Sequence, residues 1–125
     1  RRSDRRIRGR GQANRCACYR HPCRNEGLGV KVLLVLGHGS CGGVTGAISE
    51  EEGHGAIGAL LDTIRKDVPE YVGKIDSLDF AIAKHTDIQV ERITSLPHIA
   101  EKIEKGDLVV KAAHYDINTG KVTIK

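Results

Sequence analysis

Hydrophobic residues occur along the chain in short unbroken runs and in stripes at helical spacing. One unbroken run covers residues 32–36, VLLVL, and is too short for a helix of ordinary length. Such a run next to glycine-rich sequence is typical of a parallel strand buried on both faces. We therefore predict a central strand here, then a tight glycine turn, then a helix that begins within VTGAIS.

Two longer segments repeat apolar residues at helical spacing. The first covers residues 56–70 and predicts a helix that ends near Pro69. The second covers residues 76–96, with Asp79 as a plausible N-cap. The expected buried stripes are Ile57, Leu60, Leu61 and Ile64 in the first helix, and Ile82, Thr86, Val90 and Ile93 in the second.

The last 29 residues predict a short helix and a hairpin. Pro97 suits the first turn of the helix and Gly106 its end, with Ile99 and Ile103 on one side. Residues 107–125 then predict a strand, an Asn-Thr-Gly turn and a final short strand. The fold class that results is α/β, with a partly parallel sheet flanked by helices.

Length and composition fit one domain that is neither a membrane protein nor fully disordered. The chain has 125 residues, of which 39% are hydrophobic and 29% charged. No apolar run approaches the ~18 residues of a membrane span, and the N-terminus has no apolar core of a secretory signal. We therefore expect a cytoplasmic protein whose four cysteines are thiols.

The charge is divided unevenly. Nine of the eleven arginines fall within residues 1–24, whereas residues 25–125 hold 11 basic and 15 acidic residues, net −4. Residues 1–24 also contain Ile7 as their one large aliphatic residue, so they predict a disordered Arg/Cys-rich arm rather than a packed unit. Residues 25–125 form the predicted domain, and its charge does not indicate nucleic-acid binding.

The segment LGHGSCGGVTG, residues 36–46, carries the candidate chemistry. Its glycines could cradle an anion, but the segment lacks the Gly-Lys-Ser/Thr of a P-loop and the G-x-G-x-x-G pattern. Cys41 could be a thiol nucleophile with His38 as its base. His38 and Cys41 could instead bind zinc, which accepts imidazole and thiolate together but requires four ligands. In the fourth interpretation the segment is only a tight turn.

The longer phrase VLLVLGHGSCGGVTGAI resembles the second zinc motif of the β-class carbonic anhydrases, H-x-x-C followed by Gly-Gly at the end of a parallel strand. The similarity continues from residue 87 through YDINTGKV to the end of the chain. It covers residues 27–125 and describes an N-terminally incomplete domain of that family.

The resemblance implies a zinc lyase that hydrates carbon dioxide to bicarbonate through a zinc-bound hydroxide, built as a homodimer or a higher oligomer. It makes His38 and Cys41 zinc ligands, and it makes Gly42 and Gly43 the place where substrate approaches. The family also has an upstream Cys-x-Asp-x-Arg motif that supplies a third ligand and a catalytic Asp-Arg pair. The nearest string is CACYR, where Cys16 and Arg20 have the right spacing but Cys18 replaces the aspartate.

Alternatives from other classes remain open at this stage. The chain could be a catalytically inactive, dimerising relative, or a hydrolase of carbon disulfide or carbonyl sulfide on the same scaffold. The arm could also bind RNA or DNA electrostatically. The other histidines of the predicted domain have no partner at ligand spacing, and residues 49–55, SEEEGHG, predict a solvated loop.

Overall fold

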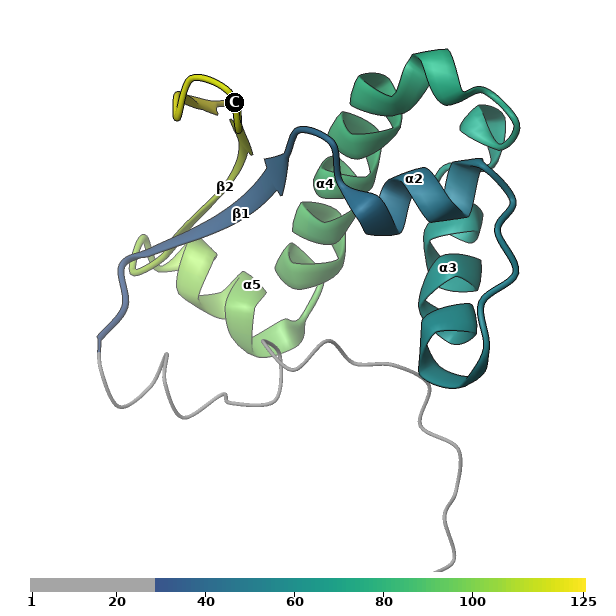
Figure 1. Ribbon diagram of the computed structural model, residues 1–125. Coiled ribbons are helices and arrows are strands. Elements are labelled where there is room, and N and C mark those ends of the chain that lie inside the picture. Colours follow the sequence, from purple (N-terminus) through teal and green to yellow (C-terminus); the bar gives the residue numbers. More distant parts are fainter. Residues whose placement is uncertain (1–28) are drawn as a thin grey trace, which may run out of the picture.

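The computed structural model describes residues 29–125, which form a three-stranded sheet and a set of helices (Figure 1). The strands are β1 (Val32–His38), β2 (Val109–Tyr115) and β3 (Val122–Ile124). The sheet order is β1-β2-β3, with β1 parallel to β2 and β2 antiparallel to β3. The predicted α/β class with a partly parallel sheet is confirmed.

The helices follow the predicted segments closely. They are α2 (Gly42–Ile48), α3 (Gly55–Asp67), α4 (Leu78–Thr94) and α5 (Pro97–Glu104), with short 3-10 turns at Pro69–Tyr71 and Ile75–Ser77. Pro97 occupies the first turn of α5, as predicted. Asp79 is not the N-cap of α4, because Ser77 takes that position and Asp79 lies in the first turn. No helix among residues 29–125 is long and apolar enough to cross a membrane.

Two apolar clusters hold the helices and the sheet together. The first joins α2, α3 and α4 and is built of Val44, Ala47, Ile48, Leu61, Ile64, Val68, Ala81 and Ile82. The second lies between the sheet, α4 and α5 and is centred on Ile93, Ile99 and Leu108. Figure 1 shows α4 and α5 along one side of β1 and β2, with α2 and α3 beyond the end of β1. The turn from β1 into α2 therefore joins the two packed units.

The prediction that the 32–36 run is buried on both faces is wrong for the described residues. In the sheet formed by residues 29–125, β1 is an edge strand, and its residues alternate between exposed and half-buried. Leu33 and Val35 face the second cluster, whereas Leu34 and Leu36 are 42% and 48% exposed. The reason is that α4 and α5 cover one face of the sheet, and no described segment covers the other.

The predicted buried stripe of α3 is half correct. Leu61 and Ile64 are buried, but Ile57 and Leu60 are exposed, because α3 packs on α2 and α4 along a narrower face than the pattern suggests. In α4 the predicted positions Ile82, Thr86 and Ile93 are buried, whereas the fourth, Val90, is half-buried.

Candidate metal centre

The turn that joins β1 to α2 places the two predicted ligands at its ends. His38 is the last residue of β1, and Cys41 is the N-cap of α2. Ser40, between them, has a left-handed φ of 54°, which non-glycine residues rarely adopt outside turns. The Gly39 N–H donates to the Tyr115 carbonyl at 3.0 Å, so pairing with β2 continues one residue past the strand. The turn is thus anchored on its strand side.

The exposed imidazole of His38 is oriented by its own turn. Its Nδ1 lies 3.0 Å from the Gly39 carbonyl oxygen. A proton on Nδ1 would be donated to that carbonyl, leaving the Nε2 lone pair available to a metal. A backbone carbonyl on the second ring nitrogen is a common arrangement around metal-binding histidines.

The Cys41 side chain is a half-buried free thiol. It makes no capping hydrogen bond to α2, although Cys41 is the N-cap; the Cys41 carbonyl instead accepts bonds from the Thr45 N–H at 2.8 Å and the Thr45 hydroxyl at 2.9 Å. The thiol also packs beside the first cluster. The backbone of Cys41 is therefore held while its sulfur remains available.

The described residues fit part of a zinc site. Imidazole nitrogen and thiolate sulfur are donors that zinc accepts together, but zinc takes four ligands. Among residues 29–125, no group of three or more His, Cys, Asp or Glu side chains could hold a metal ion. His38 and Cys41 thus fit two ligand positions. The other two named residues, Cys16 and Arg20, lie outside the described residues.

At the start of α2, packing does not require glycine at position 42 or 43. A methyl group on Gly42 would meet nothing within 4 Å among the described residues, and one on Gly43 would meet Ile64 Cδ1 at 3.5 Å, an ordinary contact. Open space beside Gly42 is consistent with the approach of a small substrate.

A polar cluster that the sequence did not reveal joins α3 to α4. The Asp67 carboxylate is buried at the end of α3 and accepts bonds from both terminal nitrogens of Arg92 and from Gln89 Nε2 at 3.1 Å. His85 Nδ1 is 3.0 Å from Asp67 Oδ2, without the geometry of a hydrogen bond within the described chain. Burial lowers the pKa of His85, an effect that the Asp67 carboxylate opposes. Asp67 stands alone at the end of its helix in the sequence, so no sequence pattern predicts that its carboxylate binds Arg92 and Gln89 of α4.

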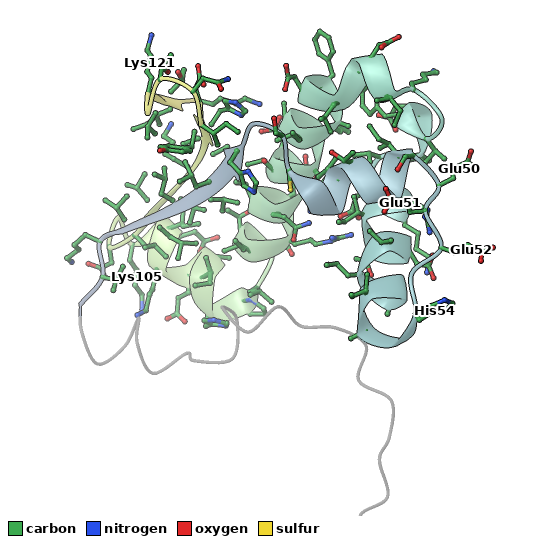
Figure 2. The ribbon with its side chains drawn as sticks, in the orientation of Figure 1. Glu50, Glu51, Glu52, His54, Lys105 and Lys121 are labelled. Carbon is green, nitrogen blue, oxygen red and sulfur yellow. The ribbon has the colours of Figure 1, made fainter. Side chains whose placement is uncertain are left out.

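The acidic loop between α2 and α3 lies away from the sheet (Figure 2). Glu50, Glu51 and Glu52 line an open pocket there together with Arg65. The Arg65 guanidinium donates to the Ala47 and Glu51 carbonyls at 3.0 and 2.6 Å. These bonds satisfy carbonyls at and beyond the end of α2, so the loop has a structural explanation.

Comparison with known proteins identifies the fold. The family model described as carbonic anhydrase matches residues 25–122. No curated protein sequence matches. Among solved structures, a tetrameric β-carbonic anhydrase from Sordaria macrospora is 23% identical, with a TM-score of 0.70 over 80% of this chain. The Coccomyxa β-carbonic anhydrase in complex with acetazolamide is 21% identical, with a TM-score of 0.70 over 80% of this chain.

A third similar structure is the β-carbonic anhydrase CafD of Aspergillus fumigatus, at 17% identity and a TM-score of 0.64 over 82% of this chain. The matches cover 54%, 49% and 61% of the Sordaria, Coccomyxa and Aspergillus chains, so this chain spans about half to three fifths of their length. At these identities the structures establish the fold, and the family model covers most of the chain. The chain belongs to the carbonic anhydrase family and has the fold of its β-class members.

Proposed function

We propose that this protein is a zinc-dependent β-class carbonic anhydrase that interconverts carbon dioxide and bicarbonate, with His38 and Cys41 as two of its zinc ligands. The observation that carries the proposal is the turn from β1 to α2, which brings an imidazole and a free thiol to the two ends of one short turn. The family match supports this assignment.

Bound zinc would supply a hydroxide nucleophile at neutral pH, because zinc lowers the pKa of its bound water towards ~7, as is known for carbonic anhydrases. The chain's own part is to hold the donors and leave room for substrate. The Gly39 carbonyl orients the His38 ring, and the backbone bonds of Cys41 fix the start of α2. The open space beside Gly42, next to Gly43, would let carbon dioxide approach the backbone closely.

Cys16 is our proposed third ligand and Arg20 a proposed catalytic residue. A cysteine at position 18, where the family has an aspartate, cannot form the Asp-Arg pair. We therefore expect this chain to hydrate carbon dioxide slowly. We also propose a homodimer or a higher oligomer, supported by the tetrameric state named for the Sordaria relatives.

A second candidate is a family member without catalytic zinc that acts as a dimerising domain. Two observations favour it: the described residues offer only a partial ligand set, and one face of their sheet is uncovered and apolar. Both candidates predict association, but they predict opposite metal contents.

Elemental analysis and stopped-flow carbon dioxide hydration separate the two candidates. We expect bound zinc in the wild-type chain, lost in His38→Ala and Cys41→Ser and retained in the control His54→Ala, which alters an exposed histidine of the distant loop. Cys16→Ser should lose zinc and Cys18→Ser should keep it, a matched pair within one motif. A folded wild-type chain that binds no zinc would favour the second candidate.

A further inference from the structure

The end of β1 lies against α4 at one closely packed point. Gly37, the residue before His38, faces Thr86 in the middle of α4. A methyl group built on Gly37 would overlap the Thr86 hydroxyl and would lie 3.3 Å from Ile82 Cγ2. The strand therefore approaches the helix as closely as a residue without a side chain permits.

Thr86 is a fixed obstacle at that point. It is 5% exposed, and its hydroxyl donates to the Ile82 carbonyl at 2.8 Å inside α4. A β-branched side chain in a helix has few rotamers, so the hydroxyl cannot turn away without losing this bond. Ile82 beside it is 2% exposed and is packed within the first cluster. Thr86 thus determines the distance between β1 and α4 at Gly37.

The position of the strand in the plane of the sheet is set separately. Gly37 pairs with His114 and His38 with Tyr115, and the Gly39 N–H bonds to the Tyr115 carbonyl. Because side chains alternate along a strand, His38 projects from the face opposite the one that Gly37 presents to α4. Any shift of Gly37 away from α4 would therefore carry the imidazole with it.

We infer that Thr86 is a positioning residue for the metal centre, acting through Gly37 to fix the distance of the His38 end of β1 from α4. This inference rests on the proposed zinc function. Cys41 is held by a different set of contacts, at the start of α2. The contact between Gly37 and Thr86 thus determines the position of His38 relative to Cys41.

A double-mutant cycle on the full chain tests the inference, with zinc affinity measured by chelator competition. Gly37→Ala should weaken zinc binding about tenfold or more, the range expected for groups that orient a ligand, and Thr86→Ala should weaken it by a smaller factor. The double variant should return to within about twofold of wild type, because the methyl group added at 37 fills the space vacated at 86.

Two control variants separate positioning from general packing. Thr94→Ala removes another threonine of α4 whose hydroxyl also donates to a backbone carbonyl, that of Val90 at 3.0 Å, but it lies eight residues from Thr86, so this variant should bind zinc as wild type does. Thr86→Val keeps the volume of the side chain and should also retain affinity. Visible spectra of the cobalt-substituted proteins should change in Gly37→Ala and recover in the double variant.

The outcomes distinguish this inference from the proposed function. A wild-type chain without zinc affinity would overturn the proposed function and this inference with it. Two outcomes would overturn this inference alone. One is a Gly37→Ala variant that binds zinc as tightly as wild type; the other is a double variant that binds zinc no more tightly than Gly37→Ala does. If Gly37→Ala does not fold, the two Thr86 variants still test the inference. Weaker zinc binding by Thr86→Ala than by Thr86→Val would support the inference, and equal affinities would overturn it.

Discussion

The glycines of residues 36–46, the candidate zinc motif, serve different physical purposes. Gly37 is required by packing, because a side chain would meet Thr86, whereas Gly42 borders open space among the described residues. Ser40 takes a left-handed conformation that glycine would adopt at lower cost. The glycines of the motif therefore cannot be explained by one rule about turns.

Gly42→Ala should separate stability from activity. Alanine is favoured over glycine inside a helix by up to about 1 kcal/mol, so the metal-free chain should unfold at the same temperature or slightly higher. Carbon dioxide hydration should fall severalfold, because the methyl group would occupy the proposed approach path. Stopped-flow rates with thermal unfolding measure both effects, and unchanged hydration would contradict the role given to Gly42.

Glu50→Gly should stabilise the fold by about 0.5–1 kcal/mol, because Glu50 has a left-handed φ of 60° that is unfavourable for a residue with a side chain. It follows α2 in a Schellman cap, in which Glu51 N–H donates to the Gly46 carbonyl and Glu50 N–H to the Ala47 carbonyl. At the end of α5 the matching position is Gly106. Chemical denaturation measures the gain, and Glu52→Gly, at an exposed position without this strain, should give none.

At the scale of elements, α3 and α4 are joined by both apolar and ionic contacts. The buried Asp67 carboxylate holds Arg92 and Gln89 of α4, and His85 lies beside it. A buried carboxylate with a bidentate arginine fixes the relative position of two helices more specifically than apolar contact does. This region supports the helix that carries Thr86.

Acidification should weaken the fold through His85. Its pKa is lowered in the folded chain by burial, so as the pH falls below about 6.5 the unfolded chain takes up a proton before the folded chain does. The stability contributed by neutral His85 is present above that pH and is lost as the pH falls. We expect denaturation midpoints to drop between pH 7 and pH 5.5, and His85→Gln to reduce the drop. A His98→Gln control, at an exposed residue of α5, should leave the pH dependence intact; equal slopes for both variants would contradict the assignment.

At the scale of the whole molecule, one face of the described sheet is apolar and open to solvent. The six large aliphatic side chains on it come from all three strands; they are Val32, Leu34, Leu36, Val109, Val122 and Ile124. The charged Lys111, which pairs with Leu34, lies among them. Exposed aliphatic side chains gathered on one face are uncommon on a soluble monomer, and we expect this face to be a surface of association.

Leu34→Thr should reduce self-association, measured by light scattering during size-exclusion chromatography, with a change in unfolding free energy of less than about 1 kcal/mol. Leu33→Thr is the matched control, because Leu33 packs into the second cluster and its loss should cost about 2–3 kcal/mol without a direct effect on the open face. Association that is unaffected by Leu34→Thr would show that another surface is responsible.

Much of this architecture is readable from the sequence. The helical stripe of α4, the proline and glycine that bound α5, and the Asn-Thr-Gly hairpin are local signals, set by side-chain spacing and backbone preference. The His38 and Cys41 pair was also visible, because its two members lie three residues apart in a glycine-rich turn.

The tertiary structure decided what depends on distant partners. An apolar run cannot reveal whether its strand is central or at an edge, since that depends on which strands pair beside it. The partners of Asp67 lie 22 and 25 residues away, and Thr86 meets Gly37 across 49 positions. Local sequence determined the elements and the two candidate ligands; the packing of α4 on the sheet determined which faces are buried and what holds His38 in place.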